Sequence, residues 1–82
     1  MKKDFSLKVV AENNFSVINR IINIFNRRRI RIKKAILLEM EDDLRRGEAT
    51  FVLHTTHEML IKAKLQIEKL IEVEYTEWQE IQ

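Results

Sequence analysis

Two histidines stand three positions apart and are the first candidates for chemistry in this sequence. His54 and His57 form an H-x-x-H pair between a strand-like apolar run and a helical pattern. A metal ion would need a further ligand, yet the spacing differs from the i, i+4 pair of helical zinc sites and the chain has no Cys. We therefore interpret the pair as solvated side chains near a helix start. We predict no metal site and no cofactor in this chain.

Acidic side chains gather in one short segment. They are Glu39, Glu41, Asp42 and Asp43. Paired carboxylates serve acid–base or Mg²⁺ chemistry, but a polar hairpin loop over 42–47, which ends at the only glycine, explains them better. The two serines, Ser6 and Ser16, lie outside any G-x-S-x-G elbow. The sequence therefore predicts no catalytic site, and we expect a protein that is not an enzyme.

A cluster of basic residues is the sharpest charge feature. Its members are Arg27, Arg28, Arg29, Arg31, Lys33 and Lys34. Such a run can bind phosphate backbones, but the net charge of the whole chain is only +2. We favour the interpretation that the arginines complement the dipole of a helix that ends there.

Hydrophobic periodicity predicts six elements that position these residues. Alternating apolar and polar residues are typical of half-buried strands, and apolar residues at helical spacing are typical of amphipathic helices. The predicted strands are 5–10, 30–40, 49–54 and 73–78, and the predicted helices are about 15–28 and 55–71. An interruption at Lys33–Lys34 indicates a bulge. An Asn before the first helix and a capping box at Thr55 and Glu58 indicate the two helix starts.

The order of these elements indicates the fold class. A β-α-β-β-α-β order predicts an α+β, ferredoxin-like fold, with a four-stranded antiparallel sheet and both helices on one face. Eighty-two residues fit a single domain over 1–82. No apolar run approaches the roughly 20 residues that span a bilayer, and the start lacks a signal-peptide pattern. We expect a soluble, cytoplasmic protein with no membrane segment.

One face of the predicted sheet lies under the helices and the other is open. The expected core residues on the covered face are Phe5, Leu7, Val9, Ala35, Leu37, Phe51 and Leu53. On the open face, one strand presents a row of large apolar residues where a solvated sheet should be polar. A one-residue slip in register would exchange the faces, but we favour an interaction site. The predicted interface residues are Ile36, Leu38, Met40, Val52, Ile61 and Leu65.

RNA-recognition modules share this element order and stack bases on aromatic residues of the first and third strands. Here those strands carry Phe5 and Phe51, and both belong to the expected core face. The K/R-G-F/Y-G/A-F-V motif is absent. Nucleic-acid binding through the basic cluster therefore stays the less favoured alternative.

Three segments resemble a known family. Residues 11–21, written AENNFSVINRI, resemble the E-N-x-P-G-V-L-x-R-I opening of ACT domains, most closely that of the small regulatory subunit of acetolactate synthase. Residues 24–32 are similar to its L/I-F-x-R-R-x-x-N-I segment, and residues 66–73 to its Q-L-x-K-L-I-D-V segment. The matches keep the family's order and spacing and extend over about residues 5–78.

The resemblance implies a non-catalytic regulatory subunit of branched-chain amino-acid biosynthesis. Its partners would be the thiamine-diphosphate-dependent catalytic subunit of acetolactate synthase and a second copy of the chain, often paired edge to edge. A branched-chain amino acid would be the effector, bound between the first strand and the first helix. A stand-alone amino-acid-sensing ACT module that regulates another enzyme or a transcription factor is the alternative.

The effector would lie at the start of the first helix, where free N–H groups suit a carboxylate. By the resemblance, the binding residues are Asn13, Asn14, Phe15, Ser16, Val17 and Ile18. Asn13 matches the family's Asn, whereas Phe15 and Ser16 stand in place of its Pro and Gly. Arg29 and Arg31 also stand in place of the family's Gly and Asn. The bulk of Phe15 and Ser16 predicts an activating subunit that is insensitive to valine.

Overall fold

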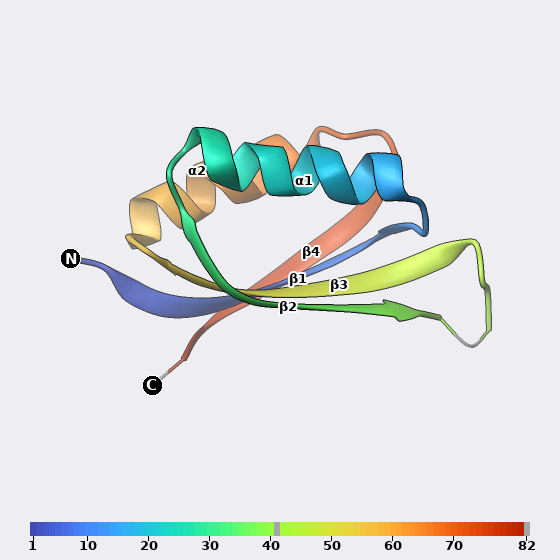
Figure 1. Ribbon diagram of the computed structural model, residues 1–82, viewed down its shortest axis with the longest axis horizontal. Helices are drawn as coiled ribbons and strands as arrows, with labels where there is room; N and C mark the ends of the chain where they lie inside the picture. The colour runs from blue at the N-terminus through green and yellow to red at the C-terminus, as the bar shows by residue number, and fades with distance from the viewer. Residues whose placement is uncertain (41, 82) are drawn as a thin grey trace.

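Four strands and two helices follow one another in the predicted order (Figure 1). The computed structural model describes residues 1–40 and 42–81, so Glu41 of the acidic segment lies outside the described residues. The elements are β1 (Lys3–Glu12), α1 (Phe15–Arg27), β2 (Arg31–Glu39), β3 (Arg46–Thr55), α2 (His57–Glu68) and β4 (Val73–Ile81). Within the described residues, no helix is both long enough and apolar enough to cross a bilayer.

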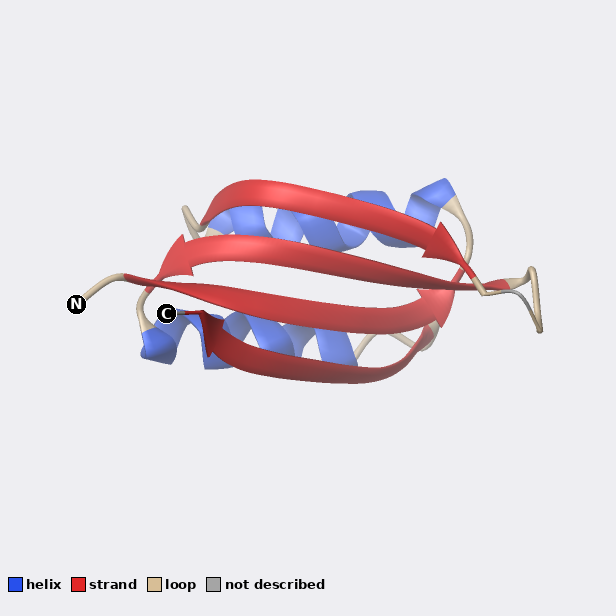
Figure 2. Cartoon of the chain, turned by 90° about the horizontal axis from the view of Figure 1, so that it is seen from below, coloured by secondary structure: helices blue, strands red, loops and turns tan. Residues whose placement is uncertain are grey.

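The strands form one antiparallel sheet in the order β2-β3-β1-β4. Both helices lie on the same face of this sheet, and the opposite face is uncovered (Figures 1 and 2). The predicted ferredoxin-like fold is therefore confirmed. The predicted bulge is confirmed as well, because the β2–β3 register shifts between Ile32 and Lys34.

Helix α1 begins and ends at recognisable caps. The side chain of Asn14 accepts a hydrogen bond from the Val17 amide at 2.9 Å, as an N-cap residue does. At the other end, the amides of Arg29 and Ile30 donate to Asn26 O at 3.0 Å and to Phe25 O at 2.9 Å. This pair of bonds is a Schellman motif, which explains why Arg29 adopts a φ of 55° where glycine is favoured.

Helix α2 differs from its prediction at both ends. Its N-cap is Thr56, whose Oγ1 accepts from the Met59 amide at 3.1 Å, whereas Thr55 is the buried last residue of β3. The predicted cap at Thr55 was therefore wrong by one residue. The helix also ends at Glu68, three residues early, and Ile71 in the following turn is 94% exposed. The apolar period continues past the helix, so periodicity does not indicate where the helix ends.

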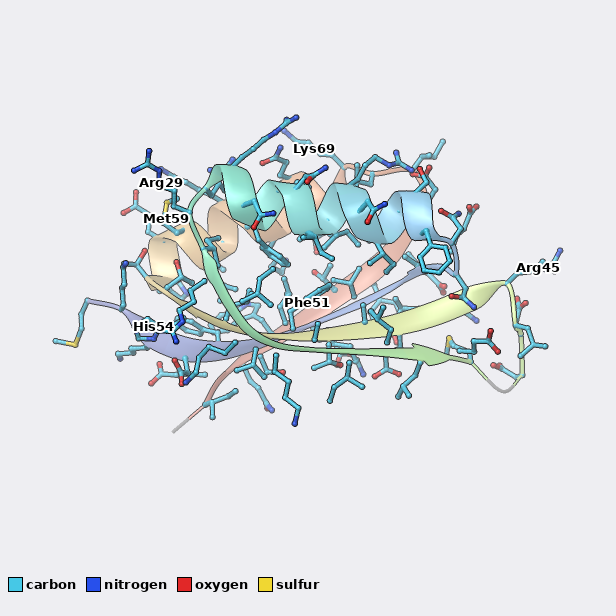
Figure 3. The ribbon with its side chains drawn as sticks, in the orientation of Figure 1. Arg29, Arg45, Phe51, His54, Met59 and Lys69 are labelled. Carbon is cyan, nitrogen blue, oxygen red and sulfur yellow. The ribbon has the colours of Figure 1, made fainter. Side chains whose placement is uncertain are left out.

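The core lies between the two helices and the central strands. Of the predicted core residues, Phe5, Leu7, Val9, Phe51 and Leu53 are fully enclosed. The rings of Phe25 in α1 and Phe51 in β3 pack edge to face with centroids 5.1 Å apart. Figure 3 shows Phe51 between the sheet and the helices.

The predicted burial of Ala35 and Leu37 was wrong. Their register partners are Phe51 and Ala49, so both residues do face the helices. Both are nevertheless exposed, Leu37 by 53%. The reason is that β2 is an edge strand, and the helical side chains enclose the central strands instead.

The connection between β2 and β3 lies two residues nearer the N-terminus than predicted, at 40–45 instead of 42–47. Strand β2 ends at Glu39, so Met40 lies just past it, and its amide donates to Arg46 O at 3.1 Å. Arg46 and Gly47 belong to β3 and not to the loop. The hairpin projects beyond the helices at the end of the molecule where α1 begins (Figure 1).

Candidate functional site

A pocket of about 280 Å³ opens between the start of α1 and the helix-facing side of β1, β2 and β3. Its apolar lining consists of Val9, Ala11, Ile18, Ile21, Leu37 and Ala49. Its more polar rim includes Glu12, Asn13, Asn14, Glu39, Gly47 and Glu48, with Phe15 and Leu38 beside them. We call it the α1 pocket. Its size is near the lower end of small-molecule sites, which are roughly 300–1,000 Å³.

Small residues explain why space remains here. Gly47 lies between Glu39 of β2 and Ala11 of β1 in the strand register, and Ala49 lies between Leu37 and Val9. A Cβ at Gly47 would lie 3.3 Å from Leu38 O and 3.4 Å from both Cβ and Oδ1 of Asn13. Any other residue there would therefore crowd the mouth of the pocket.

The segment that carries the polar rim is held on both sides. The Glu12 amide donates to Glu72 O at 3.0 Å, and the Asn13 amide donates to Arg45 O at 2.8 Å. Arg20 of α1 forms an ion pair with Glu72, and this hydrogen bond lowers the pKa of the Glu72 carboxyl. The turn that leads into α1 is thus tied to both neighbouring loops and presents a pre-formed site.

The amides at the start of α1 are available to a ligand. Asn14 satisfies the Val17 amide, but the described residues provide no acceptor for the amides of Phe15 and Ser16. Free amides and the positive end of the helix dipole favour a carboxylate.

The structure brings together four of the six predicted effector residues at the α1 pocket. Asn13, Asn14, Phe15 and Ile18 line it, whereas Ser16 and Val17 do not. The Val17 side chain is enclosed in the core. Phe15 is 84% exposed, and among the described non-glycine residues only Arg29 has a positive φ. The helix start therefore accommodates Phe15 and Ser16 without the left-handed backbone that a Gly at that position would allow.

Sequence reasoning missed the strand residues of the pocket. Leu37, Glu39 and Ala49 come from strands that meet α1 only in the folded molecule. One signal was present: the only glycine stands at the start of β3, where a small residue leaves room beside its neighbour strands.

The two histidines have separate partners. Nδ1 of His54 lies 2.7 Å from Oδ1 of Asp4, and Nζ of Lys33 donates to Oδ2 of the same carboxylate at 2.7 Å. The bond from Lys33, and then that with His54, lowers the pKa of Asp4. The ring of His57 instead packs against Trp78, with centroids 5.2 Å apart. Among residues 1–40 and 42–81, no cluster of three His, Cys, Asp or Glu could hold a metal ion.

The basic cluster is distributed over the corner between α1 and β2. Arg28 donates from Nε to Oε1 of Gln66 at 3.1 Å, and Lys33 pairs with Asp4. The enclosed positions of Phe5 and Phe51 leave neither ring free to stack on a base, as the sequence predicts.

The predicted interface residues lie in two places. Ile36, Leu38 and Val52 are on the uncovered sheet face, where Ile36 and Leu38 are exposed and Val52 is half-buried. Met40, half-buried, follows the end of β2. Ile61 is half-buried and Leu65 exposed on α2. The rest of the uncovered face is largely polar: Lys8 there pairs with Glu77 at 3.4 Å and with Glu48 at 3.8 Å.

Comparison with known proteins identifies the fold. No protein-family model matches the sequence, and no curated protein matches it. Among solved structures, the ACT domain of GTP pyrophosphokinase from Chlorobium tepidum superposes with a TM-score of 0.79 at 14% identity, covering 96% of this chain and 100% of that one. The acetolactate synthase small subunit from Thermotoga maritima gives a TM-score of 0.76 at 19% identity, covering 98% of this chain and 48% of that one.

A third similar structure is a homoserine dehydrogenase from Thiobacillus denitrificans, with a TM-score of 0.82 at 15% identity, covering 100% of this chain and 18% of that one. The sheet order, the two helices on one face and these likenesses agree. The chain has the ferredoxin-like βαββαβ fold of ACT domains.

Proposed function

We propose that residues 1–82 form one ACT-type regulatory domain that binds a small amino acid in the α1 pocket and has no catalytic site of its own. The observation that carries this proposal is the pocket itself. It combines an apolar interior with a rim that includes Phe15, whose amide has no acceptor among the described residues. An amino acid would place its carboxylate at the helix start and its side chain against Leu37 and Ile18.

The direct test is a calorimetric titration of the full chain with L-valine, L-leucine and L-isoleucine. Saturable binding of any one of them supports the proposal. If none of the three binds, the proposal is contradicted. An effector at 100 times its Kd should also raise the free energy of unfolding by about 2.7 kcal/mol.

A matched pair of variants locates the binding site. Leu37 lines the pocket and Leu44, in the hairpin, does not, although both side chains are exposed. Leu37→Ala should weaken amino-acid binding several-fold, because it removes apolar contact with the ligand. Leu44→Ala should leave the affinity unchanged.

Insensitivity to valine is a separate prediction. It follows from the resemblance, in which Phe15 and Ser16 replace Pro and Gly. The titration decides it without further variants: saturable binding of valine would contradict insensitivity and would still support the proposed amino-acid site.

For the regulated enzyme, we propose the catalytic subunit of acetolactate synthase, which would place the protein in the cytoplasm. The three sequence segments support this choice, as does the fold shared with an acetolactate synthase small subunit. The test is co-purification with a thiamine-dependent catalytic subunit followed by an activity assay. If neither complex nor activation is seen while amino acids still bind, a different regulated partner is indicated.

We also propose a homodimer that pairs at the edge of β2. That strand has one unpaired edge in the order β2-β3-β1-β4 and is exposed along its whole described length apart from half-buried Ile32. The bulge and the lysines at 33–34 discourage pairing at one end. The segment 35–39 therefore offers the free edge. Sedimentation equilibrium of the purified chain tests the dimer.

A further inference from the structure

The α1 pocket has an uneven charge. No Lys, Arg or His is among the described residues that line it, whereas Glu12, Glu39 and Glu48 all do. Two of these carboxylates already have partners. Glu48 pairs with Lys8 at 3.8 Å, and Glu12 accepts from Nδ2 of Asn14 at 3.4 Å. No described side chain forms an ion pair or a hydrogen bond with the carboxylate of Glu39.

The strand register directs Glu39 toward the pocket. Ala35 and Leu37 face the helices, and alternation along β2 places Glu39 on the same face. Lys8 and Glu48 belong to the opposite face: Glu48 is the register partner of Val10 and Leu38. Glu39 is therefore the lining residue whose charge lies on the ligand's side of the sheet.

Small residues follow Glu39 across the sheet. In the row that crosses β2, β3 and β1, Glu39 is followed by Gly47 and then by Ala11. The Asn13 side chain lies beside Gly47 in this row, and the lining also includes Phe15, whose amide has no acceptor among the described residues. The pocket thus has an anionic wall on β2 and a carboxylate-binding mouth at α1, with apolar side chains in between.

We propose that Glu39 binds the ammonium group of the ligand and makes the α1 pocket specific for amino acids over the 2-oxo acids that share their carbon skeleton. This inference rests on the proposed amino-acid site. The apolar lining cannot discriminate between two ligands with the same side chain, and the helix start binds the carboxylate of both. Only the ammonium group, which Glu39 attracts, differs between them.

The test compares six probes by calorimetry on the full chain: L-valine, L-leucine, L-isoleucine and the three corresponding 2-oxo acids. We expect each amino acid that binds to do so about tenfold to a hundredfold more tightly than its 2-oxo acid, the range for one hydrogen bond to a charged group. Glu39→Gln should weaken amino-acid binding by a similar factor. It should leave 2-oxo acid binding unchanged or improved, because it removes a repulsive charge.

The matched control is Glu80→Gln, an exposed glutamate of β4 beside Phe5 in the register, at the other end of the sheet. It should change neither affinity, and both variants should keep the native circular dichroism spectrum. If an amino acid and its 2-oxo acid bind equally well, or if Glu39→Gln alters both ligands alike, the role of Glu39 is wrong and the amino-acid site stands. If no amino acid binds, the site is wrong and the inference fails with it.

Discussion

Strands β2 and β3 lie side by side, but the helix-facing apolar residues of β3 are buried and those of β2 are largely exposed. Strand β3 has Phe51 and Leu53 on its helix-facing side, and neither is exposed. Strand β2 has Leu37 on the same side, and it is 53% exposed, while Leu38 on the other side is 58% exposed. The difference lies in position, because β3 has a strand on each side and β2 is at the edge. Apolar character in a strand therefore predicts burial only when the place of that strand in the sheet is known.

The apolar residues of β2 also differ from those of β3 in the surfaces that they form. They contribute little to the enclosed core, so stability alone does not account for them. Leu37 lines the α1 pocket, and Ile36 and Leu38 form the apolar corner of the uncovered face. Residues of β3 should therefore govern folding, and residues of β2 should govern binding.

The largest effect should separate two identical substitutions on neighbouring strands. Leu53→Ala removes an enclosed side chain and should lower the free energy of unfolding by about 2–5 kcal/mol. Leu37→Ala should cost less than about 1 kcal/mol, because its side chain is already half in water. Urea denaturation followed by circular dichroism measures both. Equal losses of stability would mean that Leu37 on the edge strand is buried as deeply as Leu53 on the central strand.

A second substitution tests the uncovered side of β2. Leu38→Asp should leave the fold intact but weaken self-association or partner binding at least tenfold, since it puts a charge into an exposed apolar patch. Leu44→Asp, also exposed but in the hairpin, is the control. Sedimentation equilibrium measures self-association, and circular dichroism shows whether the variant is folded. An unfolded Leu38→Asp chain would contradict the exposed position of this side chain.

A smaller gain is expected in the connection that leads from α1 into β2. Arg29 has a φ of 55°, a conformation that costs a non-glycine residue roughly 1–2 kcal/mol. Arg29→Gly should therefore raise the free energy of unfolding, by about 1 kcal/mol after the entropy of glycine in the unfolded chain is included. Arg27→Gly, in the last turn of the helix, should lower it instead. Thermal denaturation of both variants provides the measurement.

The smallest effect concerns the side chains that join β2 to the central strands on the uncovered face. Asp4 of β1 bonds to Lys33 and His54, and these bonds lower its pKa in the folded protein. A lowered pKa adds stability above the unfolded value of about 3.9, and that stability is lost as the pH falls through the folded value. Asp4→Asn should therefore destabilise the chain at pH 7, and the difference in stability from the parent should shrink as the pH falls from the unfolded pKa through the lower folded pKa and be lost at still lower pH. A stability difference that persisted at this low pH would have a cause other than the charge of Asp4.

Much of the fold could be predicted because short-range patterns specify it. The Asn cap of α1 is a local signal, and alternation in β1 and β3 placed Phe5 and Phe51 correctly. The misjudged end of α2 has a local cause too: Ile71 keeps the apolar period, but the chain has already turned. The helix-start half of the candidate site was predictable for the same reason. Its strand half was not, because Leu37 and Glu39 are more than 20 residues away from Asn13 along the chain.

By itself, the amino-acid sequence determined the order of the elements, the N-cap of α1, the bulge in β2 and which side chains share a face, since each depends on neighbours a few positions apart. Only the tertiary structure decided that β2 lies at the edge, that Leu37 stays in water and that Glu39, Gly47 and the start of α1 meet around one pocket. Strand order is a long-range property: hydrogen bonds along a strand edge are alike whichever strand supplies them, so packing of the helices against the whole sheet selects the order.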